Sequence, residues 1–143
     1  MSQENVELVE NLLQGSSNMD RDELLAALPQ LIAAICAPDV EWVEDPRRAD
    51  GRAYVGHAAV LGSWQRWLEQ WDRYGFEIEE VLDCGDEVLV CATERARGAG
   101  SGASVEARLY ALIGMRDGKV ARYREFTDGE DARRAAGIGG VDG

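Results

Sequence analysis

The sequence has few of the residues from which metal centres and disulfide frameworks are built. It contains one histidine, His57, and three cysteines, Cys36, Cys84 and Cys91, with no CxxC pair. Zinc sites need clustered cysteines and histidines, so no metal is expected. Three cysteines cannot all pair with one another, and each lies in an apolar segment. We therefore expect buried free thiols, as in a reducing compartment.

Positive charge and long apolar runs are also scarce. The chain has 15 basic residues against 27 acidic ones, a formal net charge of -12. Nucleic acids and anionic membranes attract positive charge, so neither is expected as a partner. No apolar run approaches the roughly 18 residues that span a bilayer, and no basic start leads into an apolar stretch as in a signal peptide. These absences predict a cytoplasmic protein.

The length and the hydrophobic periodicity predict a single domain that begins with helices. The 143 residues, 1–143, contain no linker and no internal repeat, and 137–143 is expected to be a disordered tail. Apolar residues recur at spacings of three and four, and Pro29 predicts a kink or two short helices within the second segment. The predicted helices cover residues 3–14, 20–35 and 57–74.

The second half of the chain alternates apolar and polar residues as β-strands do. Gly85-Asp86 and Asp117-Gly118 are typical of tight hairpin turns, and such short links produce antiparallel neighbours. The glycine-rich loop 98–103 is not a phosphate loop, because no Lys-Ser/Thr follows it. Helices first and strands later predict an α+β domain. The predicted strands are 40–45, 76–83, 87–97, 104–116 and 119–127, and a short helix follows over 128–136.

One segment carries a family resemblance. Asp39-Val40-Glu41-Trp42-Val43-Glu44-Asp45-Pro46, followed by Tyr54-Val55-Gly56-His57, places an acid after a short apolar strand, before a proline that stops the strand. Together with the element order, this segment resembles the SnoaL-like branch of the NTF2-like superfamily, which includes ketosteroid isomerases and polyketide cyclases. The resemblance implies a cone in which about three helical segments pack on a strongly curved, mostly antiparallel sheet enclosing one pocket.

The resemblance also points to two candidate catalytic acids, Asp45 and Glu125. In the isomerases the carboxylate of this V-E-D-P segment is the proton-transfer base, and the concave side of the last strand would carry Tyr123 and Glu125. A carboxyl beside a phenol in an apolar cavity loses hydration, which raises its pKa toward acid/base work. Each acid has a structural alternative: Asp45 could cap its loop by accepting backbone hydrogen bonds, and Glu125 could pair with an arginine.

Further residues are expected around the pocket. Trp64 matches a helix position where the isomerases carry a pocket tyrosine, although plain core packing explains it equally well. Tyr54 and His57 flank the loop into that helix, where His57 could instead cap the helix start. Tyr123 completes the expected pocket, whereas Trp42 alternates away from the acid after its strand and is expected in the core or an interface.

The sequence also departs from the isomerase pattern. Those enzymes hold the developing oxyanion with a tyrosine and a protonated aspartic acid, and the resemblance places Leu12 and Ala111 there. Because that electrostatic contribution is usually large, a true steroid isomerase is disfavoured. One open function is a cofactor-independent isomerase or cyclase acting on a small hydrophobic, carbonyl-containing molecule. The alternative is a non-catalytic binding or interaction module of the same fold.

Assembly is the last expectation from the sequence. Tyr110 and Leu112 share the outer face of their strand with Arg108 and Glu106. Surfaces that mix aromatic residues and arginine suit interfaces, and related domains often pair through this face. We therefore expect a homodimer through the convex face of the sheet.

Overall fold

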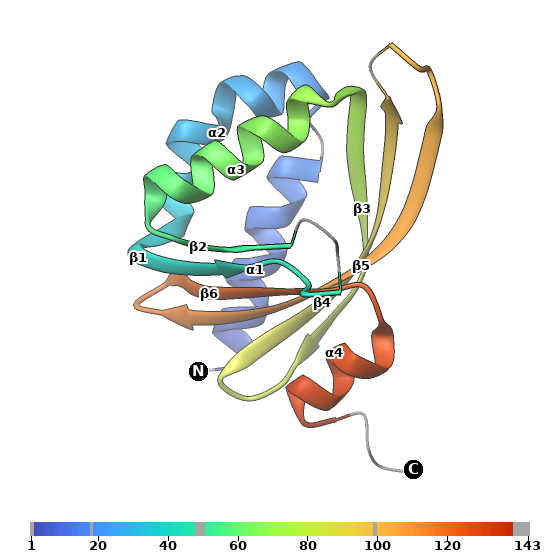
Figure 1. The fold of residues 1–143 in the computed structure, drawn as a ribbon. Helices are drawn as coiled ribbons and strands as arrows, with labels where there is room; N and C mark the ends of the chain where they lie inside the picture. The colour runs from blue at the N-terminus through green and yellow to red at the C-terminus, as the bar shows by residue number, and fades with distance from the viewer. Residues whose placement is uncertain (1, 18, 48–50, 99, 139–143) are drawn as a thin grey trace.

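The computed structural model describes residues 2–17, 19–47, 51–98 and 100–138 (Figure 1). Helices cover one side of a curled sheet, and a short helix near the C-terminus lies on the other side. The elements in chain order are α1 (Ser2–Ser17), α2 (Arg21–Ile35), β1 (Cys36–Val43), β2 (Ala53–Val55), α3 (His57–Glu69), β3 (Trp71–Asp83), β4 (Glu87–Gly98), β5 (Ser104–Arg116), β6 (Lys119–Phe126) and α4 (Gly129–Ala136).

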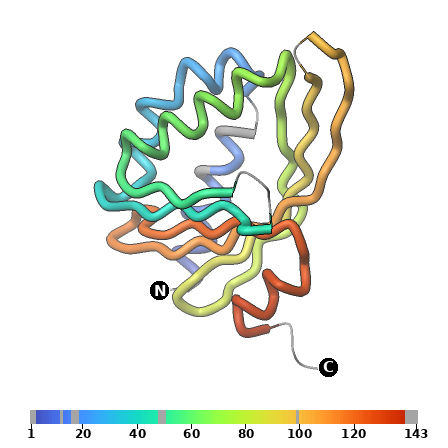
Figure 2. The backbone as a smooth tube through the Cα atoms, viewed as in Figure 1, coloured from blue at the N-terminus to red at the C-terminus, as the bar shows by residue number. Residues whose placement is uncertain are grey.

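The strands form a mixed six-stranded sheet in the order β2-β1-β6-β5-β4-β3. β1 and β6 pair in parallel, and the other neighbouring strands formed by the described residues pair antiparallel. The sheet bends strongly without closing, and α1, α2 and α3 lie on its concave side (Figure 2). The predicted α+β fold with a curved, mostly antiparallel sheet is confirmed. The parallel β1–β6 pair brings the C-terminal ends of these two strands, which lead to Asp45 and Glu125, next to each other.

Helix α2 begins at a capping box and continues through Pro29 as one helix. The carboxylate of Asp20 accepts from the Glu23 amide at 2.8 Å, and the Glu23 carboxylate accepts from the Asp20 amide at 3.0 Å. This capping box satisfies two amides of the first helical turn. Pro29 lies inside α2 without dividing it into two helices. Burial of Leu28 and Ile32 on either side favours the continuous helix.

The prediction of a helix over 57–74 is wrong at its C-terminal end. α3 ends at Glu69, and Trp71 already belongs to β3, where it pairs with Gly98 of β4. Aromatic residues fit strands as well as helices, and pairing with β4 decides the outcome. The sequence reading also missed the three-residue strand β2, and it extended β1 beyond Val43.

Two hydrophobic clusters lie on opposite faces of the sheet. The larger one, on the concave side, joins α1, α2 and α3 to the sheet, and Val40, Val60 and Leu68 are fully buried in it. The smaller one is formed by Leu89 and Leu112 beneath Ala132 of α4. Leu112 is 0% exposed, so the expectation that it contributes to an interface is wrong. The fourth helix covers that part of the convex face.

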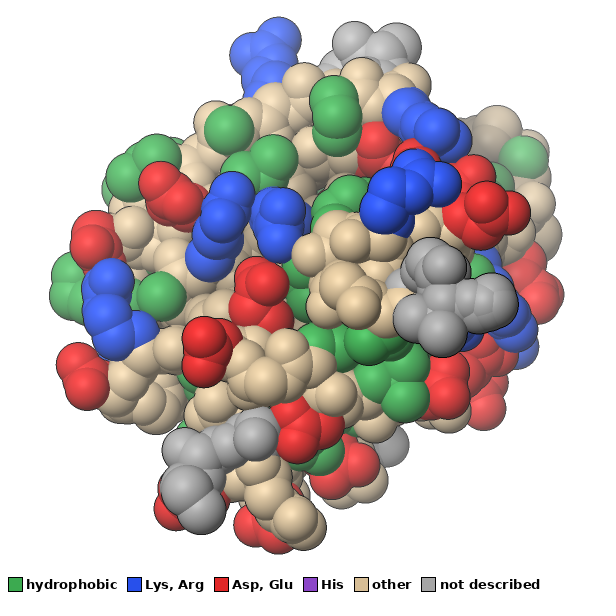
Figure 3. All heavy atoms as spheres, turned by 90° about the horizontal axis from the view of Figure 1, so that it is seen from below, with side chains coloured by type: hydrophobic (Ala, Val, Ile, Leu, Met, Phe, Trp, Pro, Cys, Tyr) green, Lys and Arg blue, Asp and Glu red, His purple; other side chains and the backbone are tan. Residues whose placement is uncertain are grey.

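The rest of the convex face carries ion pairs. Arg95 lies 3.0 Å from Glu77 and 3.6 Å from Glu106, and Arg108 lies 3.2 Å from Glu79. Figure 3 shows the molecule from below, with acidic and basic side chains next to one another. Acidic side chains of this face are therefore paired locally with arginines. Exposed pairs of this kind contribute little stability each.

Two further features bear on the expected compartment and partners. Cys36 and Cys91 are buried free thiols, as expected, and Cys84 is free and half-buried. Burial raises the pKa of Cys36 to about 11, so this thiol stays protonated at neutral pH. Across the described part of the chain, no helix combines the length and the apolar character needed to cross a membrane.

Candidate functional site

An apolar cavity of about 130 Å³ lies between the helices and the concave face of the sheet. Its helical walls consist of aliphatic side chains of α1 and α2 together with Trp64 of α3. Phe76, Ile113 and Tyr123 line it from the sheet. Such a space, walled by apolar groups, favours an apolar occupant.

The lining changes from apolar to acidic along the concave face. A second apolar space of about 100 Å³ reaches Tyr74 and Leu109, and a third, smaller space of about 30 Å³ is bordered by three carboxylates. Trp42, Trp64 and Tyr123 border all three spaces. We call the three spaces together the graded cavity. Its acidic end is formed by Glu44, Glu94 and Glu125.

Aromatic rings determine the shape of the graded cavity. Trp42 and Tyr123 are register partners across β1 and β6, and their rings stack at 3.7 Å with an angle of 7° between their planes. The ring of Trp64 is T-shaped to those of Trp42 and Tyr74, with ring centroids 6.1 and 6.3 Å apart. Trp42 was expected in the core or an interface, and it does pack against the core. It also lines the cavity. The sequence reading missed that role because it took the residue to point away.

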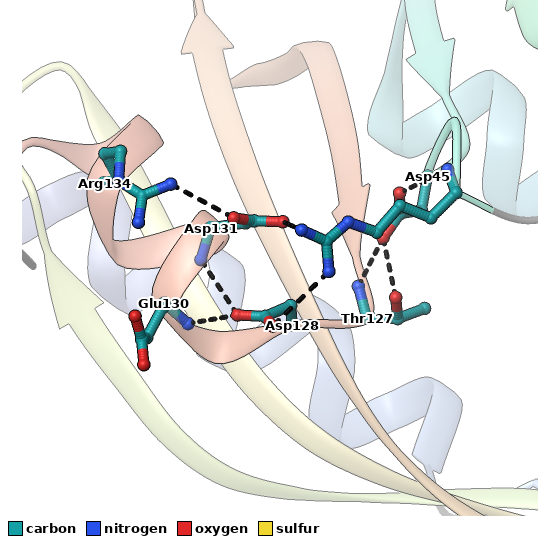
Figure 4. Close-up of polar contacts among 7 residues, drawn as sticks. Asp45, Thr127, Asp128, Glu130, Asp131 and Arg134 are labelled. Carbon is teal, nitrogen blue, oxygen red and sulfur yellow. Dashed lines mark hydrogen bonds and ion pairs between the residues drawn. The ribbon is translucent and has the colours of Figure 1, made fainter.

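The structure gives Asp45 a loop-capping role. This residue lies two positions beyond β1, and it is 3% exposed. Its carboxylate accepts from the Arg47 amide at 2.8 Å, the Thr127 amide at 2.7 Å and the Thr127 hydroxyl at 2.8 Å (Figure 4). It is not among the groups that line the graded cavity.

The electrostatics of Asp45 agree with that role. Burial opposes its ionisation, but the hydrogen bonds from Arg47 and Thr127 together outweigh burial and lower the pKa below its ordinary value. The raised pKa expected for an acid/base catalyst is therefore not found at Asp45. The alternative left open by the sequence, a carboxylate that caps its own loop, describes the observed contacts.

The loop after β1 is also bound to α4. The Arg47 guanidinium lies 2.7 Å from the Asp131 carboxylate and 3.4 Å from that of Asp128. Asp128 caps α4, because its side chain accepts from the amides of Glu130 and Asp131 at 2.8 and 3.1 Å (Figure 4). These contacts and the Asp45–Thr127 hydrogen bonds join the loop after β1 to the end of β6 and to the start of α4.

Glu125 lies beside Asp45 but faces the cavity. Its carboxylate accepts from the Asp45 amide at 3.0 Å, and its half-buried side chain lines the acidic end. The parallel pairing of Val43 with Arg124 brings the two segments together from opposite ends of the chain. The structure therefore unites the two predicted acids, with only Glu125 among the cavity-lining groups.

Two carboxylates of the acidic end were missed. Glu94 lies on β4 and accepts a short hydrogen bond from the Tyr74 hydroxyl. Burial first, and then the charge of Glu94, raise the pKa of Tyr74 well above its ordinary value. A signal for Glu94 was present, because alternation along β4 places it on the inward face with Val90 and Ala92. Glu44 follows β1, and its carboxylate accepts from the Arg52 amide at 3.1 Å.

The two remaining predicted pocket residues, His57 and Tyr54, pack elsewhere in the domain. His57 begins α3, and its Nε2 lies 2.9 Å from the Cys36 carbonyl, to which it can only donate. Tyr54 packs half-buried against the core. Neither lines the graded cavity. Within the described residues, no three His, Cys, Asp or Glu side chains form a group that could hold a metal ion.

The curled sheet with helices on its concave side defines the NTF2-like class of fold. Residues 20–123 match the SnoaL-like domain family, and the chain belongs to that family. No curated protein matches the chain.

Three solved structures with this fold are similar to the chain. A protein from Jannaschia sp. CCS1 assigned to the SnoaL-like polyketide cyclases has 21% identity and a TM-score of 0.70, covering 98% of this chain and 94% of its own. A protein of ketosteroid isomerase-like fold from Catenulispora acidiphila, in complex with trimethylamine, has 15% identity and a TM-score of 0.68, covering 92% and 93%. TerC, co-crystallised with polyporic acid, has 21% identity and a TM-score of 0.65, covering 93% and 98%. These similarities show the fold.

Proposed function

We propose that this protein binds a small, mainly apolar, carbonyl-containing molecule in the graded cavity and that Glu125 transfers a proton on it. The observation that supports this is the change of lining from aliphatic and aromatic side chains to carboxylates within one set of adjoining spaces. The apolar walls bind the body of the ligand, since burying apolar surface gives about 25 cal/mol per Å². The acidic end then faces its reactive carbon.

The proposed chemistry is cofactor-independent proton transfer. The Glu125 carboxylate removes a proton from the carbon next to a carbonyl, which leaves an enolate. The resulting carboxylic acid returns that proton to another carbon in an isomerase, or to the new alkoxide after ring closure in a cyclase. Proton and charge balance without a redox partner. Glu125 is preferred to Asp45 because only Glu125 borders the cavity.

A non-catalytic binding protein is the second candidate, and one observation favours it. The position that carries the protonated oxyanion donor in the isomerases is Ala111 here, a buried alanine in the cavity wall. Alanine cannot donate to an oxyanion, and such a donor commonly contributes about 3 kcal/mol to catalysis. TerC, which has this fold, was co-crystallised with polyporic acid, which supports the binding of an organic ligand as a candidate function.

Binding and turnover can be measured separately with hydrophobic ketones. Trp42 and Trp64 line the cavity, so their fluorescence should change as it fills. Wild-type protein is expected to bind such ketones and to exchange their α-hydrogens with deuterated water. Glu125→Gln should slow exchange roughly 100-fold and change affinity only a few-fold. Glu41→Gln is the matched control, because Glu41 lies on β1, exposed, 3.7 Å from Arg122.

Each outcome selects between the candidates. Exchange that depends on Glu125 but not on Glu41 supports the enzyme. Binding without exchange in the wild type selects the binding protein. If no apolar ligand changes the fluorescence or the thermal stability of the protein, both candidates fail.

A further inference from the structure

We propose that the ligand of the graded cavity is a ketone with two fused rings, and that the cavity is too short for a third ring. This inference rests on the proposed function, because it names the class of molecule that the same cavity takes. It adds a limit on size. One ring fills each of the two apolar spaces, and the carbonyl group lies at the acidic end.

The volumes of the two apolar spaces set the number of rings. The first space measures about 130 Å³ and the second about 100 Å³. An apolar protein cavity of about 150 Å³ holds benzene, so each of these spaces has room for about one ring. A fused ring shares an edge with its neighbour and needs less room than a separate ring. The smaller second space therefore suits one ring of a fused pair.

The two apolar spaces adjoin, so one rigid molecule can fill both. Six side chains border the first space and the second: Leu13, Trp42, Trp64, Phe76, Ile113 and Tyr123. Leu109 borders the second space and the acidic end but not the first space. The second space thus lies between the other two. The ring next to the carbonyl group occupies the second space, and the other ring occupies the first.

The aromatic part of the shared wall favours a flat ligand. The rings of Trp42 and Tyr123 are stacked with 7° between their planes, and the Trp64 ring stands at 76° to that of Trp42. Aromatic rings pair favourably in offset-stacked and in edge-to-face arrangements. Rings in two nearly perpendicular planes border the same spaces, so a flat fused ring system can make both kinds of contact.

Two alanines leave the second space open. Ala92 on β4 and Ala111 on β5 are buried, lie diagonally across the two strands and border the second space. Side chains of a strand stand roughly perpendicular to the sheet, so a larger side chain at either position would occupy this space. Neither alanine borders the first space or the acidic end. Ala111 is therefore a position at which the second space alone can be filled.

Buried side chains limit the length of the ligand. Tyr74 borders the second space, its hydroxyl donates to Glu94, and its ring contacts that of Trp64. At the other end, aliphatic side chains of α1 and α2 border the first space, and Leu28 and Ile32 among them are buried. Close-packed side chains do not make room for extra atoms without strain. A third ring would therefore remain outside or displace the core.

Three methyl ketones with the same polar end test this inference by calorimetric titration at pH 7. They are acetophenone, 2-acetylnaphthalene and 2-acetylanthracene, which have one, two and three rings. The second ring buries further apolar surface, so 2-acetylnaphthalene is expected to bind about tenfold more tightly than acetophenone. The third ring finds no space, so 2-acetylanthracene is expected to bind about tenfold more weakly than 2-acetylnaphthalene, although its apolar surface is larger.

Two variants assign the preference to the second space. Ala111→Leu fills this space and should reduce the advantage of 2-acetylnaphthalene over acetophenone from about tenfold to about twofold or less. Ala33→Leu is the matched control, because Ala33 is exposed on α2 and borders none of the three spaces. It should leave the advantage unchanged. If Ala111→Leu does not fold, the wild-type ranking of the three ketones decides.

The outcomes separate this inference from the proposed function. Affinity that rises steadily from one ring to three would overturn the size limit and leave the proposed function standing. Equal binding of acetophenone and 2-acetylnaphthalene would overturn the use of the second space, as would a full two-ring advantage in Ala111→Leu. If these three ketones fail but other hydrophobic ketones bind, only this inference is lost. If no hydrophobic ketone binds, the proposed function fails with it.

Discussion

Asp45 and Glu125 are neighbours, joined by the hydrogen bond from the Asp45 amide to the Glu125 carboxylate at 3.0 Å. Their surroundings nevertheless differ. The Asp45 carboxylate is enclosed by donors of its own loop and of Thr127, whereas the Glu125 side chain borders a cavity lined by aromatic rings. One carboxylate accepts hydrogen bonds from its own loop and from the end of β6, and the other borders the cavity in which we propose that a ligand binds.

The comparison teaches that burial alone does not make an acid catalytic. Asp45 is the more deeply buried of the two acids, yet its pKa is lowered, because three short hydrogen bonds outweigh the loss of hydration. Burial raises the pKa of a carboxyl group only where such donors do not outweigh it. The direction of the shift at Asp45 thus follows from the number of donors that face it.

The largest expected effect is the loss of stability in Asp45→Ala. The substitution removes a buried carboxylate that accepts three hydrogen bonds, from the Arg47 amide, the Thr127 amide and the Thr127 hydroxyl, which should lower the free energy of unfolding by about 3 kcal/mol. Urea denaturation measures this loss. Asp39→Ala is the control, since Asp39 is exposed and pairs with exposed Arg116. Equal stability of the two variants would contradict the structural role of Asp45.

Glu125→Gln should have the opposite effect to Asp45→Ala: little loss of stability and a large loss of proton exchange. The amide keeps an oxygen for the Asp45 amide, so the free energy of unfolding should change by less than about 1 kcal/mol. Proton exchange on a bound ketone should nevertheless slow about 100-fold, which corresponds to roughly 2.7 kcal/mol of barrier. A large loss of stability would show that Glu125 is structural, like Asp45.

The pH dependence of stability sharpens the comparison further. The pKa of Asp45 is lower in the folded chain than its ordinary value of 3.8. Its stabilising contribution is therefore present above pH 3.8 and is lost as pH falls toward the folded pKa, because the unfolded chain binds the proton first. Asp45→Asn should flatten the stability profile below about pH 4 relative to wild type. Parallel acid denaturation curves of the two proteins would count against this.

The last prediction concerns the convex face of the sheet and needs no substitution of Asp45 or Glu125. We propose a homodimer through the part of the convex face that α4 leaves uncovered, which carries the ion pairs of Arg95 and Arg108. Sedimentation at micromolar concentration should give twice the mass of the chain. A monomer at that concentration would contradict the proposal.

Much of this fold could be predicted from local patterns. The capping box at Asp20 was visible as an acid followed three residues later by Glu23, and two hairpin turns were visible as Gly85-Asp86 and Asp117-Gly118. The boundary between α3 and β3 could not be predicted in this way. Its aromatic residues suit either element, and pairing of β3 with β4 decides it.

The candidate site was also predictable in part, where the alternation of side chains along a strand shows which residues share a face. Alternation along β6 placed Tyr123 and Glu125 on one face, and both border the cavity. The same rule applied to β4 would have found Glu94. The partners of Asp45 could not be found, because Thr127 lies 82 positions away and meets it only through the β1–β6 pairing.

Local patterns were enough to predict the α+β class, because hydrophobic periodicity and turn residues depend on a few neighbouring positions. Which of the two acids faces the cavity depends on contacts between distant segments. The parallel pairing of β1 with β6 brings Asp45, Glu125 and Thr127 together, and the direction of each carboxylate then depends on the donors that it meets. Those donors come from distant segments, so no local pattern specifies them.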